Sequence, residues 1–318
     1  MKILMCNRPK HVWQGGDYVQ MEETAKALRA KGIDVEIDDQ FIYVPAIKYR
    51  HFDIIHTFNF SMPWTPLQMG LAFSYKKPTV CSMIYHDRED FVPFKDQQHM
   101  ADTMTKAVFI NHGEVERFKK KVNIDDSKVE IVPNGIDEFW FKKCKKVEQR
   151  PYVLTVGRIE PHKGQLAVAK ACKNLGIKYI MAGMIVDSAY AELCEAAGAI
   201  YQSPLSQKPL RQLYANSSCV VLNSKAEIQP LTIMEAGAQA KNVVVSNQCL
   251  WKDIPGALWV ECNDIVGIKN AIEKAITLPP NKTLQEHLKN YTWSHVADKL
   301  IKIYESTLRD NHELPLHQ

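Results

Sequence analysis

At 318 residues and a formal net charge of +4, the chain has room for one large or two ordinary domains, and its charge alone is too small to indicate nucleic-acid binding. Its eight cysteines are scattered without a Cys-x-x-Cys pair, which excludes a structural zinc site of that kind and favours reduced core thiols in a cytoplasmic protein. No signal peptide and no apolar run near the ~20 residues that span a bilayer is visible, so peripheral contact with a membrane is the only kind left open.

The first half of the chain alternates short apolar runs with helix-like segments. Residues 2–6 predict a buried strand, residues 18–30 have apolar side chains at helical spacing, and residues 33–37 alternate as a strand does. This β-α-β order is typical of the start of a doubly wound parallel sheet. The pattern then predicts one mixed apolar helix and four more strands, at residues 61–75 and at 52–56, 78–84, 107–110 and 129–132.

Three histidines are predicted to lie just past strand ends, where ligands of such sheets bind. We interpret His56 and His112 as structural residues, and His86, in a polar Tyr-His-Asp loop, as a candidate site residue. Gly15 and Gly16 follow the first strand and would let the backbone approach a ligand, although a plain pair of loop glycines is the alternative. Asn-Gly within residues 133–137 predicts a tight turn, because both residue types tolerate positive φ.

The second half repeats this architecture after a basic polar stretch, residues 142–150, which predicts a linker. A nucleic-acid patch is the alternative reading, but no aromatic residues interleave its lysines. The expected strands are residues 152–156, 178–182, 199–201, 219–222, 242–245 and 258–261. The expected helices are residues 165–175, 190–197, 210–215, 264–277 and 293–308.

The most informative stretch, residues 226–238, holds Glu227 and Glu235 with seven residues between them. Pro230 suits a first helical position, which places Glu227 in a strand-to-helix loop and Glu235 one to two turns into the helix. The first turn of this helix, which includes Leu231, offers N–H groups and a dipole that attract an anion. Two carboxylates beside an anion site indicate a sugar nucleotide, whereas solvated loop and helix charges are the alternative.

Two cations flank an earlier strand-to-helix loop of the same half. Arg158 follows the strand at residues 152–156, and Lys163 precedes the next helix. Such a pair suits a diphosphate leaving group, because it neutralises the charge that grows as the glycosidic phosphate bond breaks. Ordinary surface charges are the alternative for each residue alone.

Together these motifs resemble the retaining glycosyltransferases of the GT-B fold, above all family 4, which includes sucrose synthase and bacterial α-glycosyltransferases. The resemblance rests on Gly-Arg at 157–158, Lys-Gly at 163–164, Glu227-x7-Glu235, and Pro-Asn-Gly-Ile-Asp at 133–137. It implies an α/β architecture of two Rossmann-like doubly wound domains facing a cleft. The implied domains are an acceptor-side domain at 1–145, completed by a C-terminal helix at about 300–318, and a nucleotide-sugar-binding domain at 146–299.

The resemblance also implies a role for each candidate residue of the donor site. Arg158 and Lys163 would hold the pyrophosphate, with Leu231 at the start of the helix beside it. Glu235 would bind the ribose hydroxyls, and Glu227 would touch the donor sugar.

In the first domain, the resemblance places His86 near the donor sugar and Gly15 and Gly16 close to phosphate or acceptor. The chain departs from the family at two places. Members usually carry Gly-Phe-Gly after the first glutamate, where this chain has Ile-Gln-Pro at 228–230, so the resemblance does not specify the donor sugar. Their serine after the late first-domain strand is replaced by Asn-His-Gly at 111–113.

The implied reaction is transfer of a sugar from a UDP- or GDP-linked donor to an acceptor hydroxyl, with retention at the anomeric carbon. Because no nucleophile is evident, a front-face route is expected, in which the leaving phosphate helps to deprotonate the acceptor. No Asp-x-Asp stands beside the donor loop, so we predict no required metal and no cofactor. The acceptor is left open among a glycan, a lipid-linked sugar, a small molecule and DNA.

Three other functions stay open beside this one. A sugar-nucleotide epimerase or hydrolase on the same fold would act without an acceptor. A non-catalytic nucleotide- or carbohydrate-binding module would bind without turnover. A dinucleotide-dependent dehydrogenase is disfavoured, because Gly-x-Gly-x-x-Gly is missing after the first strand.

Overall fold

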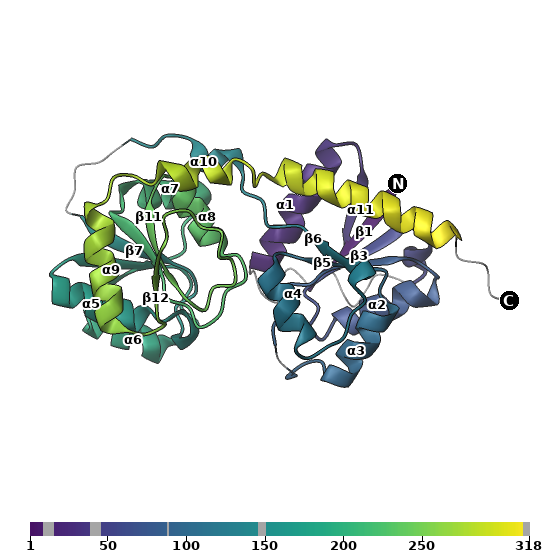
Figure 1. The fold of residues 1–318 in the computed structure, drawn as a ribbon, viewed down its shortest axis with the longest axis horizontal. Helices are drawn as coiled ribbons and strands as arrows, with labels where there is room; N and C mark the ends of the chain where they lie inside the picture. The colour runs from purple at the N-terminus through teal and green to yellow at the C-terminus, as the bar shows by residue number, and fades with distance from the viewer. Residues whose placement is uncertain (9–15, 39–45, 88, 146–150, 314–318) are drawn as a thin grey trace. The chain divides into compact units, whose positions relative to one another are not determined.

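The computed structural model of the chain describes residues 1–8, 16–38, 46–87, 89–145 and 151–313. The chain divides into two compact units (Figure 1), a first unit of Met1–Gly135 with Tyr291–Gln318 and a second unit of Ile136–Asn290. The chain therefore enters the second unit before residue 145, because the segment after Gly135 hydrogen-bonds to helices of that unit.

The first unit is built on a parallel sheet, which in its described residues has six strands in the order β2-β1-β3-β4-β5-β6. The strand order reverses between β1 and β3, and ligands of doubly wound sheets bind outside the carboxyl ends of such strands. The strands are β1 (Lys2–Cys6), β2 (Asp34–Asp38), β3 (Ile54–Phe58), β4 (Thr79–Ser82), β5 (Lys106–Phe109) and β6 (Val129–Ile131).

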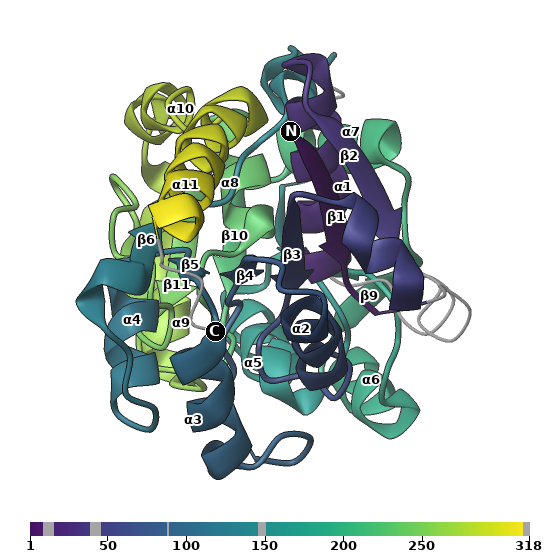
Figure 2. The ribbon, with the colours of Figure 1, turned by 90° about the vertical axis from the view of Figure 1, so that its right-hand side faces the viewer.

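Helices cover both faces of this sheet. The helices are α1 (Gly16–Ala30), α2 (Thr65–Ser74), α3 (Phe94–Thr103), α4 (His112–Lys119) and α11 (Trp293–Glu313), with the 3-10 turns η1 (Ala46–His51) and η2 (Asp126–Lys128). Alternation along β1 explains the two layers: Ile3 and Met5 join the core under α1 and α11, whereas Leu4 and Cys6 pack with Tyr49 and α2. Figure 2 shows α2 lying beside β3 and β4, in agreement with their contacts.

The second unit holds another parallel sheet, whose six described strands follow the Rossmann order β12-β11-β10-β7-β8-β9. The strands are β7 (Tyr152–Val156), β8 (Lys178–Ala182), β9 (Ala199–Gln202), β10 (Cys219–Leu222), β11 (Asn242–Ser246) and β12 (Leu258–Val260). The helices are α5 (Gln165–Leu175), α6 (Ser188–Ala196), α7 (Gln207–Asn216), α8 (Leu231–Ala238), α9 (Ile265–Thr277) and α10 (Lys282–Leu288), with the 3-10 turns η3 (Glu138–Phe141) and η4 (Pro161–Lys163).

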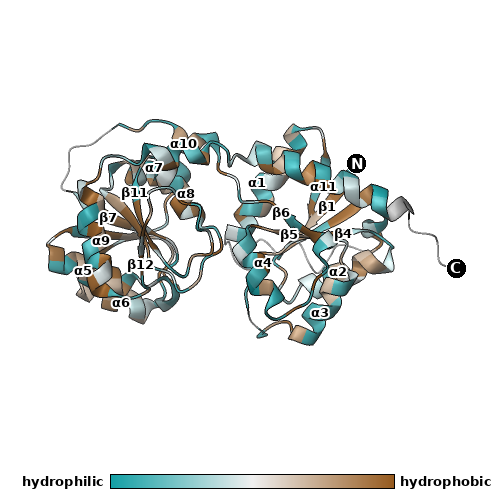
Figure 3. Ribbon diagram, viewed as in Figure 1, coloured by the Kyte–Doolittle hydropathy of each residue, from teal (hydrophilic) through white to brown (hydrophobic). Residues whose placement is uncertain are grey.

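Continuous apolar runs make the central strands of both units, because parallel strands are buried on both faces. Figure 3 shows these strands in brown, the hydrophobic end of the scale, inside each unit. The expected doubly wound architecture is thus present twice. Three helices, α3, α4 and α10, were not predicted from the sequence.

Candidate functional site

The switch point of the second sheet lies between β7 and β10, where the strand order reverses. Two loops leave the carboxyl ends of these strands, residues 157–164 after β7 and residues 223–230 after β10. The backbone N–H of Lys225 donates to the carbonyl of His162 at 2.9 Å, so the two loops touch. Every candidate residue of the donor site belongs to one of these loops or to α8.

Glycines shape the first loop where backbone meets backbone. Gly157 and Gly183 have φ of +150° and +148°, in the left-handed region that favours glycine. A Cβ at Gly183 would overlap the carbonyl oxygen of Gly157. Gly164 has a φ of +67°, and an added Cβ there would lie 2.5 Å from the Asn223 side-chain nitrogen. The loop is therefore held to one path over the sheet edge.

Lys163 and Glu227 form an ion pair across the two loops. The Lys163 Nζ lies 2.5 Å from Glu227 Oε1, and the side chains are only 18% and 15% exposed. These residues are 64 positions apart, and the fold of the two loops brings them together. A short, half-buried pair at a switch point can exchange its partners for a ligand's phosphate and hydroxyl groups.

Arg158 lies on the same loop as Lys163 but contacts a different carboxylate. One of its terminal nitrogens lies 2.9 Å from Glu160 Oε1, and its side chain is 35% exposed. Its backbone carbonyl accepts a hydrogen bond of 2.7 Å from the Gln165 side chain, which fixes the start of the loop. Arg158 thus presents a guanidinium at the edge where Lys163 presents an ammonium.

Helix α8 begins at Leu231, and Pro230 occupies its N-cap with φ of −74° and ψ of 120°. The helix thus begins one residue later than predicted, because the sequence indicated Pro230 itself as the first helical residue. Within the described residues, no side chain accepts a hydrogen bond from this end as a cap, and the first N–H groups of a helix have no partner within the helix itself. Glu235 lies in the second turn, where its Oε2 accepts a 2.8 Å hydrogen bond from the hydroxyl of Tyr214. Burial raises the pKa of Glu235 to about 7, although this hydrogen bond opposes the shift.

Two residues of the second unit, Asn223 and Tyr214, escaped the sequence prediction. The Asn223 side chain is fully buried, donates to the carbonyl of Gly164 at 3.0 Å and accepts from the N–H of Asn263 at 3.1 Å. It joins the loops after β7, β10 and β12. Its place directly after an apolar strand was an available signal, whereas Tyr214 had none, because it looks like an ordinary core aromatic.

The first unit places its candidates at the carboxyl edge of its own sheet. His86 is half-buried after β4, and its carbonyl accepts a 2.9 Å hydrogen bond from the Ser61 hydroxyl. Gly16 is exposed at the start of α1, where a Cβ would meet nothing within 4 Å among the described residues, so packing does not require glycine there. Gly15 lies outside the described residues. His112 is exposed as the first residue of α4.

Two expectations for the first unit are corrected. His56 lies within β3 rather than past its end, and its ring is fully buried between the Tyr304 hydroxyl at 2.6 Å and the Ser82 hydroxyl at 2.9 Å. Neither Asn134 nor Gly135 has a positive φ. Glycine is needed at 135 because an added Cβ would lie 2.5 Å from the Trp293 ring.

The structure adds a buried charge pair at the switch point of the first sheet. Arg8, just after β1, lies 2.6 Å from Asp17 of α1, and their side chains are 5% and 7% exposed. Asn59, just after β3, donates to the other Asp17 oxygen at 3.2 Å and has a φ of +69°. Nearby, the buried carboxylate of Glu114 accepts the backbone N–H groups of Tyr85 and Ile110, each at 2.6 Å. Burial raises the pKa of Glu114 to about 7.

The sequence model of the glycosyl transferases group 1 matches residues 136–295, half of the chain. The chain belongs to this family. A curated relative of this glycosyltransferase is the UDP-Gal:alpha-D-GlcNAc-diphosphoundecaprenol alpha-1,3-galactosyltransferase of Escherichia coli, 26% identical over 233 residues. The match covers 64% of this chain and 57% of the relative, so it spans little more than half of that protein's length.

Solved structures with similar folds include HepE from Anabaena in complex with UDP, with a TM-score of 0.79 and 14% identity over 96% of this chain and 100% of that chain. Sucrose-phosphate synthase from Thermosynechococcus elongatus has a TM-score of 0.76 and 14% identity over 97% of this chain and 99% of that one. At this identity the likeness shows the fold, which is the expected two-domain GT-B architecture of a glycosyltransferase.

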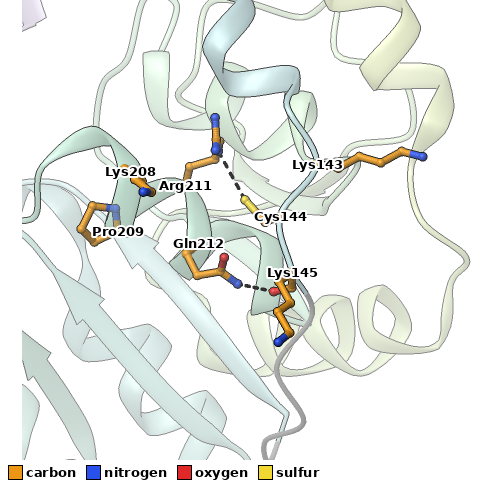
Figure 4. A pocket seen from close by; sticks show the side chains of 7 residues that line it. All are labelled: Lys143, Cys144, Lys145, Lys208, Pro209, Arg211 and Gln212. Atoms are coloured by element: carbon orange, nitrogen blue, oxygen red, sulfur yellow. Dashed lines mark hydrogen bonds between the residues drawn. The ribbon is translucent and has the colours of Figure 1, made fainter.

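This glycosyltransferase has a basic pocket elsewhere on its second unit (Figure 4). The pocket has a volume of about 410 Å³ and is lined by Lys143, Lys145, Lys208 and Arg211, among others. The Nε of Arg211 lies 3.3 Å from the Cys144 sulfur, and a terminal nitrogen donates to the carbonyl of Phe139 at 2.6 Å. The described part of the predicted linker is therefore packed against α7.

Within the residues that the structure describes, no group of three or more His, Cys, Asp or Glu side chains is placed to hold a metal ion. None of the helices in the same residues has both the length and the apolar character needed to cross a membrane.

Proposed function

We propose that this glycosyltransferase moves a sugar from a UDP-linked donor to an acceptor hydroxyl with retention at the anomeric carbon. The observation that carries the proposal is the Lys163–Glu227 pair, which lies on touching loops at the switch point of the second sheet. Arg158 adds a second cation on the same loop. The structures of HepE with UDP and with UDP-glucose support a uridine donor, since they share this fold.

The proposed donor binding is an exchange of partners. The diphosphate takes the Nζ of Lys163 from Glu227, and the guanidinium of Arg158 binds a second phosphate oxygen. The start of α8 at Leu231 adds N–H groups and a positive dipole end. Glu227, released from Lys163, then accepts hydroxyl groups of the donor sugar.

In the proposed front-face step, the bond between the anomeric carbon and the β-phosphate oxygen breaks while the acceptor oxygen bonds to the same face. The acceptor's proton passes to the departing phosphate. Lys163 and Arg158 stabilise the charge that this phosphate gains, so the step is proposed to need no metal ion. His86 and Gly16 are the first-unit residues that we assign to the same reaction from the family resemblance.

A lipid-linked sugar is the proposed acceptor. The Escherichia coli relative is named for a diphosphoundecaprenol-linked acceptor. The first unit of this chain also has a groove of about 350 Å³ between α2 and α3, lined by Phe73 and Phe91, which are 71% and 48% exposed. Such exposed aromatic side chains suit contact with lipid. We place the reaction in the cytoplasm because all eight cysteines are free thiols, as a reducing compartment maintains them.

The test is a turnover assay with UDP-galactose and UDP-glucose as donors and an N-acetylglucosamine diphosphate prenol as acceptor. Mass spectrometry would detect the product, and NMR of the new linkage would give its anomeric configuration. Lys163→Ala and Arg158→Ala should each lower the rate by about 10²–10³ while the protein stays folded. Release of free sugar without acceptor would favour a hydrolase, an inverted linkage would refute retention, and loss of activity in chelator would refute metal independence.

A further inference from the structure

Tyr214 has a fixed position between two helices of the second unit. Its side chain is fully buried on α7, and its ring meets the Trp140 ring edge-on at a centroid distance of 6.0 Å. Trp140 belongs to η3, which is hydrogen-bonded from both sides. Arg211 of α7 donates to the carbonyl of Phe139, and Gln239, just after α8, donates to the carbonyl of Trp140. The Tyr214 hydroxyl is therefore held at one point beside α8.

Glu235 accepts the hydrogen bond from the Tyr214 hydroxyl through its Oε2 atom alone. Among the described residues, Glu235 has no cationic partner, and Tyr214 is its one hydrogen-bond donor. Burial raises the pKa of the Tyr214 phenol well above its ordinary value, so the group stays protonated and always donates. The second oxygen of Glu235 is left for a ligand.

We propose that Tyr214 is a positioning residue for the donor: it holds one carboxylate oxygen of Glu235 so that the other accepts hydrogen bonds from the ribose hydroxyls of the nucleotide. This inference rests on the proposed function and names a residue through which that function acts. A glutamate side chain has several rotamers, and a fixed donor on one oxygen selects one of them. The ribose then meets a prearranged acceptor.

The hydrogen bond has a second effect, on the charge of Glu235. It stabilises the carboxylate against the burial that raises the pKa of Glu235 to about 7. Removing the hydroxyl would raise that pKa further, so more of Glu235 would be protonated at neutral pH. A protonated carboxyl is a poorer acceptor for two hydroxyl groups.

Other charges do not set this pKa. Helix α8 packs against α7, α10, β10, β11 and η3. The buried thiol of Cys219 on β10 is neutral, since burial raises its pKa to about 12. The pKa shift of Glu235 has burial and the Tyr214 hydrogen bond as its causes, and it does not involve the charged residues of these elements, which are Glu138, Lys208, Arg211, Lys282, Glu286 and His287.

The experiment is calorimetric titration with UDP and with 2′,3′-dideoxy-UDP on four proteins. These are the wild type, Tyr214→Phe, Glu235→Gln and the matched control Tyr152→Phe. The control removes a hydroxyl that donates to the carbonyl of Leu213 at 2.6 Å, next to Tyr214 on α7, without touching Glu235. A purely structural loosening of α7 would affect both tyrosine variants alike.

We expect Tyr214→Phe to weaken UDP about tenfold and dideoxy-UDP by less than twofold, and Tyr152→Phe to change neither. The pH at which UDP affinity is half lost should also move upward in Tyr214→Phe, with the ligand's own titration cancelling between proteins. If Glu235→Gln weakens UDP but Tyr214→Phe does not, the positioning role is refuted while the donor site stands. If the wild type does not bind UDP at all, the proposed function fails.

Discussion

Replacing Glu227 with glutamine should make UDP bind more tightly while donor turnover falls. The proposed donor has to take Lys163 away from Glu227, so the energy of that pair opposes binding of the diphosphate. Glutamine keeps the size of the side chain but removes the charge. Lys163 would then meet the phosphates without first losing a carboxylate.

The structure sets the size of this effect. A hydrogen bond between charged groups contributes about 1.5–3 kcal/mol when shielded from water. The pair is 2.5 Å long, but its side chains remain 18% and 15% exposed, so the lower end applies. About 1.5 kcal/mol corresponds to roughly tenfold in affinity. Turnover with UDP-sugar should fall at the same time, because Glu227 no longer accepts the sugar hydroxyls as a carboxylate.

The assay is calorimetric titration of UDP into Glu227→Gln, Lys163→Met and the double variant. The gain from Glu227→Gln should vanish in the Lys163→Met background, because there is no longer an ammonium to release. Glu273→Gln, which changes an exposed carboxylate on α9, controls for the change in net charge. Equal UDP affinity in Glu227→Gln and wild type, or an equal gain in both backgrounds, would refute the exchange of partners.

Three further predictions concern stability. Gly183→Ala should lower the free energy of unfolding by about 3 kcal/mol in urea, because its Cβ would overlap the Gly157 carbonyl. Asp17→Asn should cost about 2 kcal/mol, because it removes the charge from the carboxylate that lies 2.6 Å from the buried Arg8 guanidinium. Burial lowers the pKa of His56 from its ordinary value of 6.5 to about 3. The neutral His56 therefore contributes fully to the free energy of unfolding above pH 6.5, and this contribution is lost as the pH falls below 6.5. Between pH 7 and pH 5 the loss should be about 2 kcal/mol larger in wild type than in His56→Asn.

Each of these has its own control. Gly198 has φ of +100° but no neighbour within 4 Å of an added Cβ, so Gly198→Ala separates backbone strain from overlap. Arg8→Met with Asp17→Asn should recover part of the Asp17→Asn loss, and no recovery would contradict a charge effect. The pKa of Glu114 is raised, so Glu114 acts in the opposite direction on acidification. Only the difference between wild type and His56→Asn is therefore diagnostic, and parallel pH curves would contradict the assignment.

The strands could be predicted because buried parallel strands appear in the sequence as continuous apolar runs. The motif loops could be predicted because they follow these strands directly. Helix α3 could not, since polar residues dominate it and only Gln97, Met100 and Ala101 are buried. The Lys163–Glu227 pair joins residues 64 positions apart, and the Tyr214–Glu235 bond joins residues on different helices. Such contacts depend on how the loops close over the sheet, which local patterns do not contain. Gly135 shows the same limit, because its reason is the Trp293 ring rather than its own turn.

The hydrogen bond between His56 and Tyr304 joins residues 248 positions apart, since the last helix completes a unit that the first strand begins. The second unit is contained in one continuous stretch, residues 136–290, and can mature on the ribosome as soon as it emerges. The first unit cannot do this. His56 stays without the Tyr304 hydroxyl, and the sheet face under α1 stays without α11, until residues 293–313 have been translated.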